Sequence, residues 1–217
     1  MSFDYDLPLA FDEPHLVVDP DCSICHGTGV MREDGRLLEC TCLLRQRVLH
    51  YLTPTFGVGI AWDADFQPQP YVGNDVLLSN DGNLPFQRFR QLAYGAIKSF
   101  LINTHLQYSH RTLTPYELFR ALYDGHDAAG LADLIRNINI LVLVLSGDDP
   151  PAKHNYQFQI PWLLRKRREN AVPTWIVLGP ALDSVAFKSC YGGLCKPLAT
   201  CLAEGFIKLP LRWEDKR

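Results

Sequence analysis

Six consecutive aliphatic residues, Ile140–Leu145, constrain the fold more than any other feature of this 217-residue chain. A strand with one face in water alternates apolar and polar side chains, so an unbroken aliphatic run predicts a strand that is buried on both faces. Strands of this kind occur in parallel sheets that helices cover on both sides. Similar short runs at residues 76–78 and 174–178 predict neighbouring strands. The sequence therefore predicts an α/β domain with a mainly parallel sheet flanked by helices.

The segments between these strands carry helical periodicity or helix-capping residues. Apolar residues recur at helical spacing from Phe86 to Leu101. After a short strand at residues 111–113, Thr114, Pro115 and Glu117 have the order of a capping box that starts a second helix. Further helices are predicted at residues 43–52, 128–136, 160–170, 182–186 and 194–204, and a last strand at residues 206–211.

Four cysteines near the N-terminus form the strongest chemical motif. Cys22 and Cys25 make a Cys-x-x-Cys pair, and Cys40 and Cys42 make a Cys-x-Cys pair on the far side of a predicted β-hairpin with a turn at residues 33–35. A hairpin of this length brings the pairs together, and four thiolates satisfy a tetrahedral Zn²⁺ with no open position, as in a structural site. A redox pair would need a βαβ context, and a disulfide would need an oxidising compartment. His26 is the one alternative ligand.

Composition and charge set wider limits. Hydrophobic residues are 47% and charged residues 21% of the chain, which is enough for a proper core. We expect an acidic arm, zinc module and short helix at residues 1–53, an aromatic and proline-rich linker at 54–73, and the α/β domain at 74–217. No secretory signal is visible, and the longest aliphatic run is too short to cross a bilayer, so a cytoplasmic location is expected and no membrane partner.

The two ends of the chain differ in charge. Residues 1–31 carry six acids and no Lys or Arg, whereas residues 151–217 carry eleven Lys or Arg against five acids. In the helix predicted at 160–170, Trp162 is expected to anchor the core and the basic run to face solvent. That run either meets a phosphate backbone or is an ordinary solvated surface. The candidate nucleic-acid contacts are Arg165, Lys166, Arg167 and Arg168.

The segment after the strand at 76–78 has the strand, loop and helix order of a phosphate-binding loop. The loop contains one glycine and no lysine, and it lacks the Gly-Lys-Ser/Thr ending. We interpret it as a degenerate nucleotide loop formed by Ser79, Asn80, Asp81, Gly82, Asn83, Phe86 and Gln87. The helix that follows would still attract an anion through its dipole, but productive ATP binding is not expected.

Taken in order, these parts resemble one family. The order is similar to that of the zinc module and AAA+ domain in the DnaC/DnaI/IstB-type helicase loaders. It consists of a Cys-x-x-Cys-x-Gly-Thr-Gly knuckle, a later Cys-x-Cys, a basic helix, an aromatic linker and an α/β core. The knuckle half of the likeness is carried by Cys22, Cys25, Gly27, Thr28, Gly29, Cys40 and Cys42. The resemblance implies a P-loop AAA+-like core.

The residues that hydrolyse ATP in that family are missing here. Phe86 and Gln87 stand at the positions of the P-loop Lys and Thr, and Val144 and Leu145 stand at the positions of the two acids that bind Mg²⁺. The polar sensor position corresponds to Leu178-Gly179-Pro180. The region of the arginine finger offers Lys196 and no arginine.

Three functions remain open. The resemblance implies a catalytically inactive, helicase-loader-like adaptor of DNA replication or of a mobile-element machine, nucleoid-associated and able to oligomerise. It would bind a replicative helicase through its zinc module, and an active AAA+ paralogue or single-stranded DNA through its core. The first alternative is an active ATP-dependent loader with an unusual nucleotide site that uses Asp148 or Asp149. The second is a nucleic-acid-binding zinc protein with no link to helicases.

Overall fold

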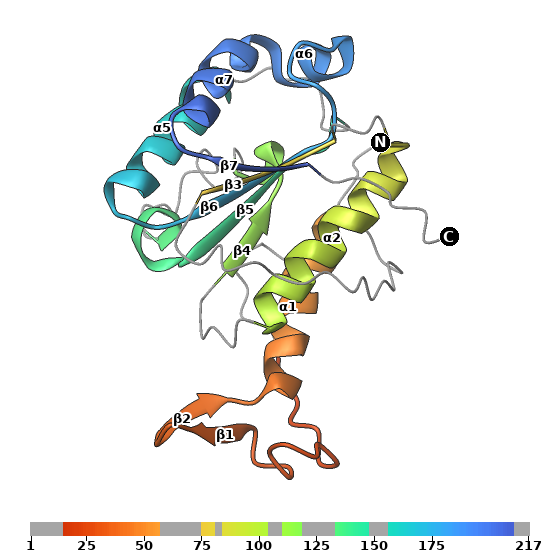
Figure 1. The fold of residues 1–217 in the computed structure, drawn as a ribbon, viewed down its shortest axis with the longest axis vertical. Helices are drawn as coiled ribbons and strands as arrows, with labels where there is room; N and C mark the ends of the chain where they lie inside the picture. The colour runs from red at the N-terminus through yellow and green to blue at the C-terminus, as the bar shows by residue number, and fades with distance from the viewer. Residues whose placement is uncertain are drawn as a thin grey trace, which may run out of the picture.

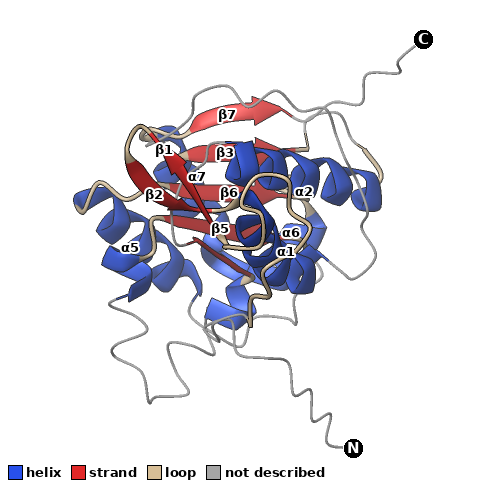
Figure 2. Ribbon diagram, turned by 90° about the horizontal axis from the view of Figure 1, so that it is seen from below, coloured by secondary structure: helices blue, strands red, loops and turns tan. Residues whose placement is uncertain are grey.

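The computed structural model describes residues 15–56, 75–80, 84–103, 110–118, 133–147 and 156–210. Its centre is a sheet of five parallel strands in the order β4-β5-β6-β3-β7 (Figures 1 and 2). The strands are β3 (Val76–Ser79), β4 (His110–Leu113), β5 (Ile140–Leu145), β6 (Thr174–Leu178) and β7 (Ile207–Pro210). A parallel sheet flanked by helices, with this crossover order, is consistent with the P-loop AAA+ fold and confirms the predicted fold class.

The first strand of the domain lies inside the sheet, between β6 and β7. From β3 the chain crosses to β4 at one edge, whereas from β6 it crosses the other way to β7, beyond β3. The connections from the neighbouring strands β3 and β6 therefore run in opposite directions, and the register of this pair aligns Ser79 with Leu178. In open α/β sheets, ligands bind at such a switch point, outside the carboxyl ends of the strands.

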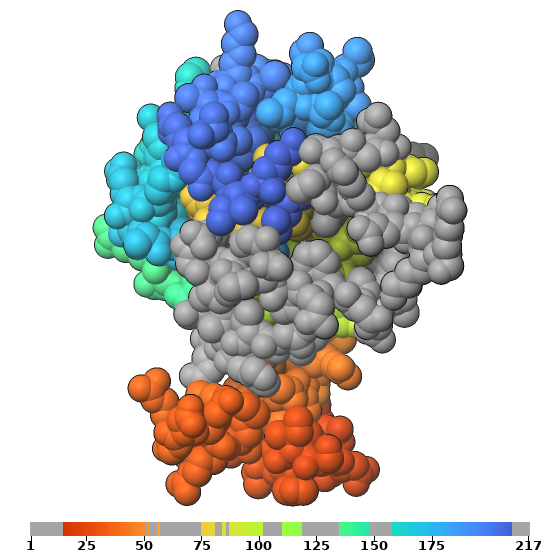
Figure 3. Space-filling model, in the orientation of Figure 1, coloured from red at the N-terminus to blue at the C-terminus, as the bar shows by residue number. Residues whose placement is uncertain are grey.

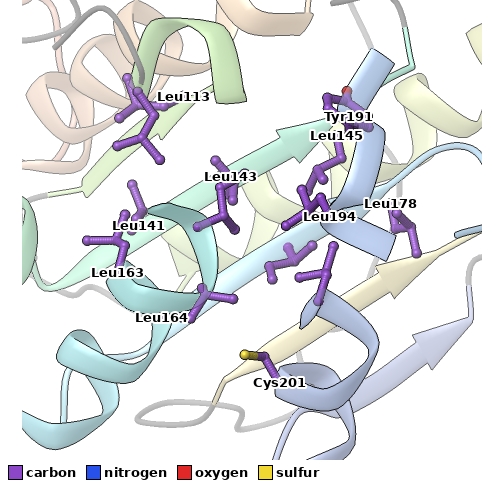
Figure 4. Close-up of a cluster of buried hydrophobic side chains, with 14 of the residues drawn as sticks. Leu113, Leu141, Leu143, Leu145, Leu163, Leu164, Leu178, Tyr191, Leu194 and Cys201 are labelled. Carbon is purple, nitrogen blue, oxygen red and sulfur yellow. The ribbon is translucent and has the colours of Figure 1, made fainter. Parts of the chain in front are cut away.

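Helices cover both faces of the sheet. Helices α1 (Thr41–Phe56) and α2 (Phe86–Asn103) share one core cluster with Val76 and Leu78 of β3. Helices α5 (Tyr156–Glu169), α6 (Val185–Tyr191) and α7 (Cys195–Ala203) share a second cluster with Leu77 (Figure 4). Since successive residues of one strand enter opposite clusters, the strand is buried on both faces, as its aliphatic sequence predicts. Short helical turns occur at η1 (Asp133–Asn137) and η2 (Gly192–Leu194).

A two-stranded hairpin stands apart from this body. Strands β1 (Val30–Glu33) and β2 (Arg36–Glu39) pair in antiparallel register around Asp34 and Gly35, which both have positive φ and form the tight two-residue turn that hairpins favour. The chain then enters α1 directly. Figures 1 and 3 show the hairpin projecting from the α/β body at the far end of α1.

Helix α1 ties the hairpin to the core. Leu44, Val48, Leu52 and Phe56 follow each other at a spacing of four residues and are all buried. The Phe56 ring meets the ring of Tyr94 in α2 at 5.8 Å, edge to face. The helix is longer than the segment predicted at 43–52, because this buried stripe continues past Pro54. Residues 57–74, where a linker is predicted, lie outside the described residues.

The predicted strands of the α/β domain are found, but the helix predicted at 182–186 begins only at Val185 and runs to Tyr191, because Ser184 caps it. Residues 119–132, where helices are also predicted, lie outside the described residues. Thr114 and Glu117 form the predicted capping box: the Thr114 N–H donates to the Glu117 carboxylate at 2.7 Å, and the Glu117 N–H donates to the Thr114 hydroxyl at 3.2 Å. Within the described part of the chain, none of the helices combines the length and the apolar character that a bilayer crossing needs.

Candidate metal centre and the carboxyl edge of the sheet

The structure brings the four predicted cysteines together. The Sγ atoms of Cys22, Cys25, Cys40 and Cys42 all lie within 4.8 Å of one another. Cys22 Sγ lies 3.6 Å from Cys40 Sγ, and Cys25 Sγ lies 3.8 Å from Cys42 Sγ. These distances are far longer than the roughly 2 Å of a disulfide. The four side chains therefore form a thiol cluster that can hold a metal ion.

The geometry of the cluster fits zinc. Sulfur ligands lie about 2.3 Å from Zn²⁺, and at tetrahedral angles this places them about 3.8 Å apart. The two measured sulfur pairs match that spacing. A set of four thiolates would fill the coordination sphere, leaving no position for water or substrate, so a metal here would stabilise structure rather than catalyse.

Local backbone geometry sets the positions of the sulfurs. Gly29 has φ +74°, and a Cβ at this position would lie 3.0 Å from Val18 Cγ2 and 3.1 Å from Leu43 Cδ1. Its carbonyl accepts a hydrogen bond of 2.9 Å from the Cys40 N–H, which fixes the second cysteine pair against the first loop. The Cys40 carbonyl in turn accepts from the Leu44 N–H at 3.0 Å and starts α1. Metal ligands and helix start are therefore one structural unit.

The thiols differ in how readily they lose a proton. Burial of the Cys25 thiol favours its neutral form, but hydrogen bonds from the Gly29 backbone and from the other three thiols outweigh this and lower its pKa to about 7. Burial raises the pKa of Cys42 to about 12, with the neighbouring thiols adding to the rise and a backbone hydrogen bond at Asp19 opposing it. Of Cys25 and Cys42, Cys25 therefore forms a thiolate first in the metal-free cluster.

The zinc module, which we define as residues 15–42, exposes four large aliphatic side chains. Val17, Ile24, Val30 and Leu37 expose 61%, 52%, 46% and 66% of their surface. The same residues 15–42 contain five acids and two arginines. The module projects from the α/β body (Figure 3), and its buried residues include Cys25 and Cys40 of the cysteine cluster.

The carboxyl end of β3 differs from an open phosphate-binding loop. The Asn80 side chain donates from Nδ2 to the Leu84 carbonyl at 3.0 Å and accepts at Oδ1 from the Leu84 N–H at 2.9 Å. The loop is therefore tied across its ends by its own side chain. Helix α2 begins at Phe86, as predicted, with the Pro85 carbonyl accepting from the Phe89 N–H at 3.1 Å. Asp81, Gly82 and Asn83 lie outside the described residues.

The carboxyl end of β5 is also occupied by protein groups. The Gly147 N–H donates to the Tyr191 hydroxyl at 3.0 Å, and the Cys190 thiol donates to the Gly147 carbonyl at 2.8 Å. Gly147 has φ +82°, and a Cβ there would lie 3.1 Å from Pro180 Cγ. Figure 4 shows Tyr191 beside Leu145 over this end of the strand. Both backbone polar groups of Gly147 are thus paired within the protein.

The remaining positions of the sequence-predicted nucleotide site are apolar or not described. Val144 and Leu145 are 2% and 0% exposed, so the side chains at the positions of the metal-binding acids lie in the core. Leu178, at the sensor position, is 7% exposed. Lys196 is exposed on α7. Asp148 and Asp149, the candidates for an unusual site, lie outside the described residues.

The basic run of α5 does not form one solvated face. Arg167 is 0% exposed, and the expectation that it faces solvent is wrong. Its guanidinium donates to Thr174 Oγ1 at 2.9 Å, to the Ile138 carbonyl at 3.0 Å and to the Pro173 carbonyl at 2.7 Å. Burial lowers the pKa of Arg167 to about 10, against the opposing effect of the Asp75 carboxylate, so the group remains a cation at neutral pH.

The other three basic residues differ in exposure. Arg168 is half-buried and pairs with Asp75 at 3.2 Å and Glu204 at 3.6 Å. Arg165 is exposed, and Lys166 forms an exposed ion pair of 2.6 Å with Glu169. Trp162 is 38% exposed, so the prediction that it anchors the core is wrong; Ile160, Leu163 and Leu164 fill that role. The exposed part of the basic run thus consists of Arg165 and Lys166.

Sequence reasoning missed Tyr191 as a residue of the carboxyl edge. Its partner Gly147 is 44 positions away, and no local motif connects the two. Of the three cysteines outside the cluster, Cys190 and Cys201 are buried and Cys195 is half-buried.

No protein-family model matches the sequence, and no curated protein matches it closely enough to count as a relative. Among solved structures, the fold is similar to that of the DnaC helicase loader. The identity is 18% over 73% of this chain and 87% of the other, with a TM-score of 0.46. DnaI matches at 16% identity, over 70% and 77% of the two chains, with a TM-score of 0.45. A candidate primosome component from Streptococcus pyogenes serotype M3 matches at 11% identity, over 92% and 86%, with a TM-score of 0.42. These are distant likenesses of fold, and no functional conclusion follows from them.

Proposed function

We propose that this protein is an adaptor that does not hydrolyse ATP and that binds a partner of a DNA-replication or mobile-element machine through its zinc module. The partner would be a replicative helicase or an active AAA+ paralogue. The observation that carries the proposal is the closed carboxyl edge of the sheet. At the carboxyl end of β3, beside the switch point, this chain places the hydrogen bonds between Asn80 and Leu84, and at the carboxyl end of β5 it places Gly147, whose N–H and carbonyl are both bonded within the protein.

The chemistry of this edge supports the absence of hydrolysis. Phosphate binding needs free backbone N–H groups and a lysine, and Mg²⁺ needs carboxylates. The N–H groups of Leu84 and Gly147 already donate to Asn80 and Tyr191. The carboxylate positions hold Val144 and Leu145, whose side chains are buried among apolar neighbours. A phosphate could use these two N–H groups only by displacing hydrogen bonds that the protein makes itself.

The zinc module supplies the second line of support. Its four exposed aliphatic side chains stand on a unit that projects from the body (Figure 3), where a partner can reach them without disturbing the sheet. We propose that Zn²⁺ held by Cys22, Cys25, Cys40 and Cys42 fixes this surface. The exposed aliphatic side chains and the five acids of the module favour a partner surface that combines apolar and basic groups.

Two measurements test the proposal. Titration calorimetry with ATP and Mg²⁺ should give no heat of binding. Micromolar affinity would contradict the adaptor function and favour an active loader that uses Asp148 or Asp149. Pull-downs with the helicase and the AAA+ ATPase of the same host should capture a partner. Leu37→Asp should abolish capture of that partner, because it replaces one of the exposed aliphatic side chains of the zinc module with a charge.

The matched control for the second measurement is Val185→Asp. Val185 is 84% exposed on α6, in the α/β body rather than on the zinc module. If both variants lose the partner equally, or neither does, the zinc module is not the docking surface.

A further inference from the structure

The four sulfurs of the cysteine cluster include two close pairs. Cys22 Sγ lies 3.6 Å from Cys40 Sγ, and Cys25 Sγ lies 3.8 Å from Cys42 Sγ. Each pair joins the loop before the hairpin to the start of α1, across 18 and 17 positions of the chain. Cys22 and Cys42 are half-buried, whereas Cys25 and Cys40 are buried. Each pair therefore combines one partly exposed cysteine with one buried cysteine.

This arrangement is typical of an oxidation-sensitive dithiol. A peroxide reaches the partly exposed sulfur, and the second sulfur beside it captures the oxidised atom before it reacts further. Cysteines that hold a metal are thiolates, the form that reacts with peroxide. The two sulfurs of a pair need to approach each other by less than about 2 Å to reach the bonding distance of a disulfide. In a reducing compartment such disulfides are transient and signal a redox change.

Pairing within each motif is disfavoured by the start of α1. Cys40 and Cys42 are two positions apart where the helix begins, and side chains at this spacing do not face each other on a helix. A disulfide between them would distort the first turn, in which the Cys40 carbonyl accepts from the Leu44 N–H at 3.0 Å. The geometry therefore favours disulfides that connect the loop before the hairpin with the helix.

Disulfides between the two motifs would also preserve the backbone of the module. The Cys25 carbonyl accepts hydrogen bonds from the Thr28 N–H at 3.0 Å and from the Thr28 hydroxyl at 2.7 Å. The Gly29 carbonyl accepts from the Cys40 N–H at 2.9 Å. Chelation leaves no bond between the two cysteine motifs to support this last contact, whereas two disulfides between them take over the role of the metal.

We propose that the cluster is a peroxide-sensitive site that releases its metal by forming the disulfides Cys22–Cys40 and Cys25–Cys42. In each pair one thiolate attacks hydrogen peroxide, so that an S–O bond forms, the O–O bond breaks and hydroxide leaves. The second thiolate attacks the sulfenic sulfur, so that the S–S bond forms, the S–O bond breaks and a second hydroxide leaves. The two sulfurs lose two electrons, the peroxide gains them, and two protons from solvent convert the hydroxides to water.

The metal leaves because only the thiolate form of cysteine binds it. The site is therefore reversible, since a thiol or phosphine reductant regenerates the four ligands. This proposal rests on the proposed binding of metal by the cluster, but it does not rest on the docking of a partner.

Oxidation of the metal-loaded, full-length protein tests the site. Protein that carries one zinc ion by elemental analysis is treated with hydrogen peroxide beside a chromophoric zinc indicator. It should release the whole equivalent after about two molecules of peroxide for each ion, and a phosphine reductant with added zinc should restore the metal content. The oxidised protein should keep the hydrogen-exchange protection of the Cys40 N–H that chelation removes.

Tryptic mapping without reduction identifies the pairing. Residues 1–31 contain no Lys or Arg, so trypsin places the first two cysteines in residues 1–32 and the other two in residues 37–45. The proposed disulfides join these two peptides, whereas disulfides within each motif leave the peptides separate.

Two double variants distinguish the two ways of joining the peptides. Cys22→Ser with Cys40→Ser keeps a proposed pair and should form one disulfide with peroxide. Cys22→Ser with Cys42→Ser has the same number of thiols, but it keeps Cys25 and Cys40, which are both buried, and should form a disulfide more slowly. Equal rates in the two variants would overturn the assignment of the pairs.

The control for oxidation elsewhere is Cys195→Ser, because Cys195 is a half-buried cysteine outside the cluster. This variant should match the intact protein in metal release and in pairing. Separate tryptic peptides, sulfinic or sulfonic acids in place of disulfides, or zinc that stays bound at about ten equivalents of peroxide would overturn this proposal alone. Protein that carries no zinc before oxidation would overturn the proposed metal site together with it.

Discussion

The hydroxyl of Tyr191 accepts a hydrogen bond of 3.0 Å from the backbone N–H of Gly147, and this joins the first turn beyond β5 to the end of α6. The adjacent residue, Cys190, binds the carbonyl of the same glycine. Two consecutive side chains of one helix thus pair both polar groups of one peptide residue at the carboxyl edge of the sheet. This edge is where an α/β protein of this topology ordinarily receives its ligand.

Removing the Tyr191 hydroxyl should weaken the fold without opening a nucleotide site. Tyr191→Phe leaves the ring in the core but leaves the Gly147 N–H without its acceptor, and we expect about 1 kcal/mol less free energy of unfolding. Urea denaturation measures the change. Tyr116→Phe, which removes a hydroxyl from a more exposed ring, is the matched control and should change stability very little. Equal stability of the Tyr191 variant and the intact protein would mean that water replaces the bond fully.

The buried arginine should be far more important for stability than its exposed neighbour. Arg167→Met keeps the apolar stem but leaves the Ile138 and Pro173 carbonyls and Thr174 Oγ1 without their donor, so we expect a loss of about 3 kcal/mol or more. Arg165→Met, two positions earlier on the same helix, should cost less than about 0.5 kcal/mol. Thermal or urea unfolding of the two variants measures their free energies of unfolding. Similar losses of stability in the two variants would contradict the assignment of Arg167 as a core residue.

The cysteine cluster should bind one metal ion for each chain. Elemental analysis of the purified protein should find zinc at this ratio, and Cys42→Ser should lose it, because three thiolates hold Zn²⁺ more weakly than four. Cys195→Ser, a half-buried cysteine outside the cluster, should retain the metal. Chelation should remove hydrogen-exchange protection from the Cys40 N–H while leaving β5 protected, since that strand is bonded on both sides within the parallel sheet. Retention of a full equivalent of metal by Cys42→Ser would rule out the four-cysteine site.

Metal affinity should fall as the pH falls. Binding displaces protons from the thiols, so protons compete with the metal. Above about pH 7 the Cys25 thiol is already ionised in the metal-free cluster, whereas below that pH its proton must be displaced as well. Cys42, whose pKa is raised to about 12, must give up its proton throughout this range. We therefore expect the pH dependence to steepen below about pH 7 by a further factor of about ten for each pH unit. Competition with a chromophoric chelator between pH 6 and pH 8 measures the slope, and a slope that is unchanged across pH 7 would contradict the order of ionisation.

Helix α5 shows where sequence reasoning could have gone further. Ile160, Leu163, Leu164 and Arg167 are spaced as one face of a helix, and the structure buries all four. The periodicity therefore indicated that Arg167 is buried and that Trp162 is exposed. The prediction failed because it followed residue type: tryptophan was placed inside and arginine outside. Burial of an arginine is tolerated here only because three acceptors at the starts of β5 and β6 converge on it, and that convergence exists only in the folded sheet.

What the sequence determined by itself is local. The aliphatic runs predicted strands buried on both faces, and the spacing of the four cysteines predicted a hairpin that brings their thiols together. Thr114 with Glu117 predicted a helix start, and each of these features depends on residues that the chain places close together. Only the tertiary structure decided that Tyr191 and Cys190 close the carboxyl edge and that Asp75 holds Arg168 across 93 residues. Such contacts depend on which strands become neighbours, and the order β4-β5-β6-β3-β7 is set by the packing of the whole domain.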